Sequence, residues 1–364
     1  MAFAPLAPWR GSPGSDDAAL DASVTIRHPF AAIRRNLPDP QADFRSRYMH
    51  IIRHYEHVAP GLKGAVFALG NFDGVHLGHQ QVIAKARALA DEMGVPLGVL
   101  VFEPHPQQFF FPDRPFFRLT PFRAKAHKLE RLGVDILAAL PFDATLATKQ
   151  APDFVLDVLV NGLHVCHVVA GYDFRFGKGR GGDAAALGYM GLMEGFGVTI
   201  VDEVKNGGET YSSTRIRELL HEGKVREAGQ MLGGWWKVET QVQKGDQRGR
   251  TIGFPTANLP LEDHVEPALG VYAVRIEIQD GPHKGVYDGV ANIGRRPTFN
   301  KSDVLLEVHI FDFDADIYGC HAGVSLIGHI REERKFDGID ALTAQIAKDS
   351  ETARRILKDA PEKP

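Results

Sequence analysis

The chain has 364 residues, enough for two or three domains that each bury a core. Apolar residues make up 44% of it, and 42 basic side chains against 46 acidic ones give a formal charge of -4, so we expect neither a nucleic-acid nor a membrane partner. Its two cysteines, Cys166 and Cys320, exclude a disulfide framework and favour a reducing, cytoplasmic location. No apolar run reaches the roughly 18 to 20 residues of a membrane span, and the first residues lack the apolar core of a signal peptide.

Residues 1–60 are rich in Pro, Arg and Ala and predict an N-terminal extension, partly disordered, with at most one helix over 44–52. From residue 61 to 232, short apolar runs alternate with helical patterns. The expected strands are 65–69, 97–102, 136–140, 165–170 and 198–201, and the expected helices include 121–132, 152–163 and 184–196. Fully apolar strands between helices predict an α/β domain with a doubly wound, Rossmann-like parallel sheet.

After Gly233 the hydrophobic period changes from 3.6 to 2. Alternating apolar residues around 236–242, 274–278 and 306–310, with turns rich in Gly, Asp and Asn, predict antiparallel strands in a small closed β-barrel. The chain then closes with an amphipathic helix over 339–357. We place the domain boundary near Gly233, after a helical linker at 213–232, and expect a fragment 234–364 to work alone.

The strongest local motif lies where the first strand of the α/β domain enters a helix. It contains Gly70, Asn71, Phe72, Asp73, Gly74, His76 and His79. Glycines allow a close backbone approach, the N-terminus of the helix attracts phosphate, and two imidazolium groups would stabilise charge on a transferring phosphate. The plainer alternative is that His76 caps the turn and His79 is solvated; Asp73 as a metal ligand is a weaker one.

Two further segments could bind phosphate. A glycine-rich basic loop at 171–183 carries Asp173 and Arg175, but it lacks the spacing of a Walker A sequence. Ser213, Thr214 and Arg217 begin a later helix, where hydroxyl groups either cap the helix or contact a nucleotide.

The barrel domain has its own candidate site. A basic loop with Gly249, Arg250, Gly253 and Pro255 leads to Thr256 and Asn258, whose side chains face the same way in an extended segment. Neutral oxygen donors and substrate phosphates suit Mg2+, although capping of a turn explains the same pair. Glu307 points away from the apolar face that Leu306 and Val308 define, and is either a solvated glutamate or a general base.

Together these motifs make the chain resemble the prokaryotic bifunctional riboflavin kinase and FAD synthetase family over 65–357. The resemblance implies a barrel domain that phosphorylates riboflavin to FMN and an α/β domain that transfers AMP from ATP to FMN, giving FAD and pyrophosphate. It implies that His76 and His79 bind the ATP phosphates with the Gly70–Gly74 turn, and that Ser213, Thr214 and Arg217 complete this nucleotide site. By the same resemblance Asp173 and Arg175 lie near the flavin phosphate, Gly249, Arg250, Gly253 and Pro255 bind nucleotide, Thr256 and Asn258 hold Mg2+, and Glu307 is the kinase base.

The sequence departs from the family pattern in its long extension and in Trp235 and Trp236 at the first barrel strand. Two alternatives stay open: only one domain is active, or the protein binds flavin and nucleotide as a regulator without turnover. Intact His76, His79, Asn258 and Glu307 argue against the second alternative. The oligomeric state is not predicted.

Overall fold

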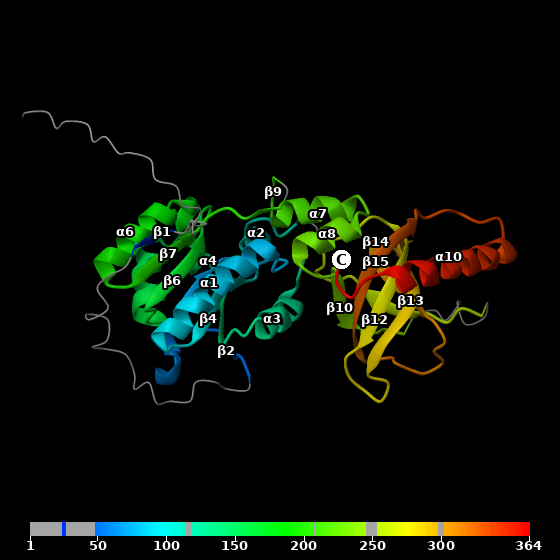
Figure 1. The fold of residues 1–364 in the computed structure, drawn as a ribbon, viewed down its shortest axis with the longest axis horizontal. Coiled ribbons are helices and arrows are strands. Elements are labelled where there is room, and N and C mark those ends of the chain that lie inside the picture. The colour runs from blue at the N-terminus through cyan, green and yellow to red at the C-terminus, as the bar shows by residue number, and fades with distance from the viewer. Residues whose placement is uncertain (1–23, 27–47, 114–117, 207, 245–252, 298–301) are drawn as a thin grey trace, which may run out of the picture.

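The structure is a computed structural model that describes residues 24–26, 48–113, 118–206, 208–244, 253–297 and 302–364. Two domains lie side by side along the long axis, the α/β domain first and the barrel second (Figure 1). The helices α7 and α8 lie where the two domains meet (Figure 1).

The α/β domain is built on a seven-stranded sheet whose inner five strands are parallel. The order is β1-β7-β6-β3-β4-β5-β2, with bounds β1 Val24–Ile26, β2 His50–Ile52, β3 Val66–Leu69, β4 Leu97–Glu103, β5 Ile136–Pro141, β6 His167–Gly171 and β7 Gly197–Val201. The helices are α1 Leu77–Met93, α2 Pro106–Phe110, α3 Phe122–Arg131, α4 Ala144–Thr148, α5 Ala151–Asp153 and α6 Ala184–Glu194. The segment η4 Phe154–Gly162 continues α5. Three short helical turns are η2 Tyr55–His57, η3 Pro60–Leu62 and η5 Lys178–Arg180. All five predicted strands are confirmed.

Each face of this sheet buries a separate core, as a doubly wound fold requires. Val66 and Ala68 pack against α1 and α3 on one face, while Phe67 and Leu69 pack against η4 and α6 on the other. Of the five inner strands, β3 comes first in the chain, and it lies between β4 and β6 in the sheet. The strand order therefore reverses at β3, and a crevice for ligands is expected at the carboxyl ends of β3 and β6.

The N-terminal extension supplies both edge strands, so the helix predicted over 44–52 is wrong at its C-terminal end. His50–Ile52 is the strand β2, which pairs parallel with β5, and Val24–Ile26 is β1, which pairs antiparallel with β7. An exposed sheet edge offers unpaired backbone groups, and these short segments satisfy them. The expected disorder of residues 1–60 falls largely on positions outside the described residues.

The linker at 213–232 consists of two helices, α7 Ser213–His221 and α8 Val225–Leu232. Gly223 between them has φ 74°, a left-handed conformation that ends the first helix. A small hairpin, β8 Lys205–Asn206 with β9 Glu209–Thr210, precedes them. The apolar faces of both helices belong to the same buried core as the barrel strands.

The second domain is the predicted antiparallel barrel. Its order is β10-β15-β12-β13-β14-β11, with bounds β10 Lys237–Gln241, β11 Ala257–Pro260, β12 Gly270–Ile278, β13 Gly285–Pro297, β14 Ser302–Ile310 and β15 His321–Arg331. A backbone hydrogen bond of 2.8 Å from Gln243 N–H to Asn258 O joins the two end strands and closes the barrel. The final helix, α10 Ile339–Asp359, buries Ala353 and Leu357 on the outer face of the barrel.

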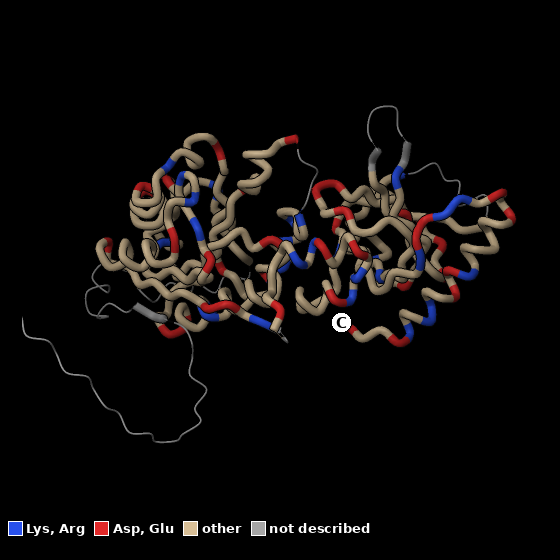
Figure 2. The backbone as a smooth tube through the Cα atoms, turned by 90° about the horizontal axis from the view of Figure 1, so that it is seen from above, with Lys and Arg blue, Asp and Glu red and all other residues tan. Residues whose placement is uncertain are grey.

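Charge is mixed over the whole molecule. Lys and Arg are interspersed with Asp and Glu along the described backbone of both domains (Figure 2). Over the part of the chain that the structure describes, no helix is long and apolar enough to cross a membrane.

Candidate active sites

The turn after β3 has an unusual backbone that aims its groups into the crevice. Phe72, Gly74 and Val75 all have positive φ values of 48°, 86° and 47°. His76 then caps α1, because its Nδ1 accepts the His79 N–H at 3.3 Å. The capping alternative for His76 is therefore observed, and it leaves the role of His79 open.

The two histidines form one stacked pair. Their ring centroids are 3.6 Å apart at 20° between the planes, and Phe72 lies edge-on to His79 at 5.2 Å. Burial lowers the pKa of His76 to about 4 and that of His79 well below its usual value. Burial thus favours the neutral form of both rings over the imidazolium form expected from the sequence. His79 Nδ1 is buried and has no hydrogen-bond partner among the described residues.

Asp73 is enclosed and serves as the centre of a hydrogen-bond network. Its carboxylate accepts the backbone N–H groups of Leu119 at 3.1 Å and Thr120 at 3.0 Å, and it pairs with Arg217 at 2.5 Å. Burial alone would raise the pKa of Asp73, but Lys125, Arg217 and the two N–H groups hold it below its usual value. Both oxygens are engaged, so Asp73 organises the turn and the structure gives no support to a metal at this carboxylate.

The second nucleotide motif lies directly against the first. Ser213 Oγ donates to Asp73 O at 2.8 Å across 140 residues of sequence, and Ser212 caps α7. Arg217 faces Asp73, while Thr214 is exposed at the start of the helix. Both predicted segments, 70–79 and 213–217, therefore meet at the end of β3.

Two lysines of α3 also belong to this site, and sequence reasoning missed them. Lys125 Nζ donates to Asn71 O at 2.9 Å and Lys128 Nζ to Gly74 O at 3.1 Å, so α3 holds the turn from one side. Burial lowers the pKa of Lys125 and brings that of Lys128 to about 8. The only sequence signal was two lysines three apart on a helix, which is usual for a solvated face.

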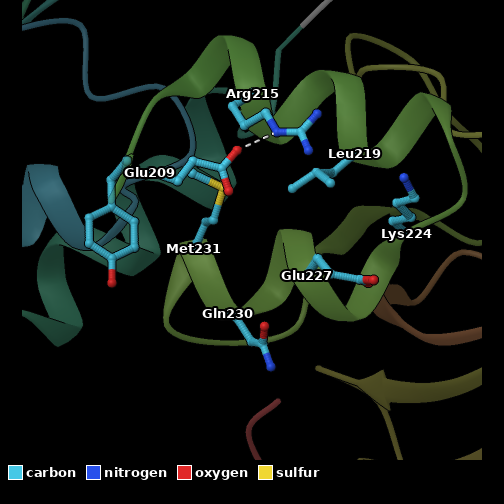
Figure 3. Close-up of a pocket in the computed structure, with 8 residues that line it drawn as sticks. Glu209, Arg215, Leu219, Lys224, Glu227, Gln230 and Met231 are labelled. Atoms are coloured by element: carbon cyan, nitrogen blue, oxygen red, sulfur yellow. Dashed lines mark hydrogen bonds and ion pairs between the residues drawn. The ribbon is translucent and has the colours of Figure 1, made fainter. Parts of the chain in front are cut away.

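Asp173 and Arg175 follow β6, which neighbours β3, so their loop leaves the sheet at the same edge. Both side chains are exposed, and Arg175 pairs with Asp183 at 3.3 Å at the start of α6. Their predicted place near a flavin phosphate stays a prediction. A separate pocket lies between α7 and α8 (Figure 3), where Arg215 pairs with Glu209 on the side of the helix opposite Arg217.

In the barrel, Asn258 and Glu307 are direct cross-strand neighbours. Asn258 on β11 is in register with Glu307 on β14, while the flanking Leu306 and Val308 are fully buried in the barrel core. Residues in register project to the same side of a sheet, about 4.5 to 5.5 Å apart at Cβ. The expected outward direction of Glu307 is confirmed, and it shares that face with the buried Asn258.

An open cavity of about 720 Å³ adjoins these residues and is lined by Gly253, Pro255, His309, Ile310, Asp312, Phe313 and Asp314. His309 Nδ1 donates to Pro255 O at 2.9 Å, which ties the segment before Thr256 to β14. Gly253 and Pro255 therefore lie near the candidate kinase residues, and their binding of nucleotide stays a prediction. Gly249 and Arg250 lie outside the described residues.

The fold and these sites define a two-domain transferase with a Rossmann-like nucleotide domain and a small barrel. A family model described as FAD synthetase matches residues 59–215, and one described as riboflavin kinase matches 232–357. A bifunctional riboflavin kinase/FMN adenylyltransferase of Haemophilus influenzae is 41% identical over 85% of this chain and 99% of its own length, and one of Bacillus subtilis is 39% identical over 85% and 98%. A crystal structure titled macrolide-efflux protein, from Streptococcus pneumoniae, is 34% identical, with a TM-score of 0.74 over 84% of this chain and 98% of that one.

The chain therefore belongs to the bifunctional riboflavin kinase/FMN adenylyltransferase family. It is an enzyme of flavin cofactor synthesis whose substrates and products are ATP, riboflavin, FMN and FAD. The fold predicted from its motifs and the family resemblance are both confirmed.

Proposed function

We propose that the two reactions use separate sites, adenylyl transfer at the 70–79 turn and riboflavin phosphorylation at the Asn258–Glu307 pair. The observation that carries this is that each domain brings its sequence-distant motifs to one place: 70–79 meets 213–217 in the first, and 256–258 meets Glu307 in the second. The domain division at residue 233 and a cytoplasmic location remain part of this proposal.

In adenylyl transfer, a phosphate oxygen of FMN attacks the α-phosphorus of ATP and pyrophosphate leaves. The N–H groups at the start of α1 and the ring of His79 would face the phosphates. Ser213 and Arg217, which contact Asp73, complete the nucleotide side together with Thr214 at the start of the same helix. Asp173 and Arg175 follow the neighbouring strand β6, where we place the flavin phosphate. The contribution of the protein is orientation of the substrates and stabilisation of charge, without a protein nucleophile.

In riboflavin phosphorylation, the oxygen of the ribityl hydroxyl attacks the γ-phosphorus of ATP, Glu307 takes the proton of that hydroxyl, and ADP leaves as the bond between the γ-phosphorus and the bridging oxygen breaks. Thr256 and Asn258 offer neutral oxygen donors beside that carboxylate, and this oxygen-only donor set suits Mg2+. When bound, Mg2+ would neutralise charge on the ATP phosphates. Gly253 and Pro255 line the neighbouring cavity and would receive the nucleotide there, and we assign the same role to Gly249 and Arg250 from the motif alone.

Two substitutions test the assignment in the full chain, with each reaction assayed separately. His79→Ala should slow FAD formation from supplied FMN by about 100- to 1000-fold and leave FMN formation unchanged. Glu307→Gln should slow FMN formation by about 100- to 10000-fold and leave FAD formation unchanged.

The controls are His221→Ala and Glu332→Gln, which change exposed residues outside both sites. Equal loss of both activities in either test variant, with a lowered Tm, would show a folding defect. Near-normal kinase turnover in Glu307→Gln would assign the base to another group.

A further inference from the structure

The segment Arg118–Thr120 connects the adenylyl-transfer site to the kinase domain. It precedes α3 in the α/β domain, and Arg118 and Leu119 are almost fully buried. The N–H groups of Leu119 and Thr120 face the α/β domain, and the carbonyl groups of Arg118 and Leu119 face the kinase domain.

The N–H side of the segment fixes the nucleotide-binding turn. Leu119 and Thr120 donate to the two oxygens of Asp73, and Thr120 Oγ1 accepts Gly74 N–H at 2.9 Å. Asp73 in turn holds Arg217. The positions of Asp73 and of the turn therefore depend on where this segment lies.

The carbonyl side is held by the kinase domain. Val265 N–H donates to Arg118 O at 2.7 Å, and Arg118 forms a β-bridge with His264. Trp236 Nε1–H donates to Leu119 O at 2.9 Å across 117 residues of sequence, and Trp236 is only 1% exposed. Because both carbonyls are buried, each donor that is lost leaves an acceptor without its partner.

A second contact between the two domains lies on α3, the helix that follows this segment. His127 on α3 lies 3.3 Å from Glu239 on β10, and its neighbour Lys128 holds Gly74 O. Gln80 on α1 also donates to Leu232 O at 3.1 Å, at the end of α8. The kinase domain thus contacts α3 directly, and α8, which packs on the barrel core, contacts α1.

We propose that Trp236 of the kinase domain is a positioning residue for adenylyl transfer in the other domain, acting through Leu119 and Asp73. The proposal rests on the assignment of adenylyl transfer to the 70–79 turn. It makes the two domains unequal, because docking of the kinase domain sets the geometry of the adenylyl site.

Trp236→Phe tests this in the full chain, since it keeps an aromatic ring and removes the N–H donor. The matched control is Trp235→Phe, which removes the Nε1–H donor to Pro361 O, just after the end of α10. Trp236→Phe should raise the KM for ATP in adenylyl transfer about five- to tenfold, the scale of one lost buried hydrogen bond, while the KM for ATP in riboflavin phosphorylation stays within about twofold. Trp235→Phe should change neither constant.

If Trp236→Phe lowers Tm, a second measurement distinguishes a local effect on residues 118–120 from a general loss of stability. Amide hydrogen exchange at Leu119 and Thr120 should accelerate in Trp236→Phe relative to the amides of β4. In a double-mutant cycle, Trp236→Phe and Thr120→Val should be non-additive for adenylyl transfer, because both act on one segment.

The proposal is overturned if Trp236→Phe leaves adenylyl transfer unchanged, impairs both reactions equally, or adds independently to Thr120→Val. These outcomes are distinct from failure of the assigned site. If His79→Ala retains full adenylyl transfer, the site itself is wrong; if His79→Ala is inactive and Trp236→Phe behaves as wild type, only the coupling is wrong.

Discussion

Asp73 shows how much of the adenylyl site depends on one buried carboxylate. It accepts two backbone N–H groups from 118–120 and pairs with Arg217 on α7, so two distant segments converge on it. The sequence indicated that Asp73 belongs to the site, from its place in a glycine-bounded turn before a helix. Its partners could not be predicted, because Leu119 and Arg217 are 46 and 144 residues away and ordinary in their local context.

Asp73→Asn should weaken this centre without changing its size. The variant removes the charge that faces Arg217 and leaves one amide N–H2 pointing at backbone donors, and breaking a buried pair costs about 3 to 5 kcal/mol. We expect a lower free energy of unfolding for the α/β domain and an adenylyl transfer rate reduced at least tenfold. Denaturant unfolding and the FMN-to-FAD assay measure these. Asp143→Asn, at the cap of α4 far from the site, is the control, and unchanged FAD formation in Asp73→Asn would contradict the role given to this residue.

Three buried histidines predict how stability depends on pH. Burial lowers the pKa of His76 and of His105 to about 4, and that of His79 well below its usual value. Between about pH 6.5 and 4 the unfolded chain binds more protons than the folded one, so their stabilising contribution is complete above about pH 6.5 and is lost as the pH falls. Each unit of pKa difference corresponds to about 1.4 kcal/mol per group.

His105→Asn should make this decline shallower. His105 caps α2 by accepting Gln107 N–H at its Nδ1, and Asn can cap a helix without titrating in this range. Urea unfolding at a series of pH values gives the slope for the wild type and the variant. The exposed His221→Asn serves as control, and an identical slope in wild type and His105→Asn would show that the ring is not held neutral.

Among the elements, those with a strong hydrophobic period were predictable from sequence. Strands β3 to β7 are short, largely buried apolar runs, and α10 has one apolar face, so periodicity located them. β1 and β2 have three residues each and owe their form to backbone pairing at the sheet edge, which leaves no periodic signal. The break between α7 and α8 depends on the left-handed Gly223, and a glycine within a helical pattern does not by itself specify a break.

Helix α3 contributes to the site through Lys125, and this contribution can be tested. Lys125→Met keeps the length of the side chain and removes the donor to Asn71 O, so the carbonyl on the crevice side of the turn loses its partner. We expect adenylyl transfer to fall about tenfold and riboflavin phosphorylation to remain unchanged. Arg123→Met on the exposed side of the same helix is the matched control. Normal FAD formation in Lys125→Met would show that the turn holds its shape without α3.

At the scale of the whole molecule, the two domains share a hydrophobic core. The cluster that fills the barrel also contains Leu119 from the α/β domain and the apolar faces of α7 and α8. The change of period at Gly233 correctly located the start of the barrel strands. It could not show that the preceding helices pack on the barrel, because an amphipathic helix does not reveal which domain covers its apolar face.

Because of this shared core, the stability of a kinase fragment depends on the residue at which the fragment starts. Ile216, Leu219, Leu220 and Leu232 on α7 and α8 are each at most 3% exposed. A fragment that starts at residue 234 lacks all four, and since burial of each such side chain contributes about 1.5 to 3 kcal/mol, it should lose several kcal/mol against a fragment that starts at Ser212. Ser212 also caps α7 and so begins the longer fragment with a formed helix.

We therefore expect fragment 212–364 to fold cooperatively and phosphorylate riboflavin, and fragment 234–364 to unfold at a clearly lower Tm with reduced yield of FMN. Thermal unfolding followed by circular dichroism, with the kinase assay at a temperature where both fragments are folded, measures the difference. The full chain carrying Leu220→Ala is the control, because it removes one of the same contacts with both domains present and should lower Tm in the same direction. Equal Tm values for the two fragments would mean that the barrel core is complete without α7 and α8, and that these helices belong to the adenylyltransferase domain alone.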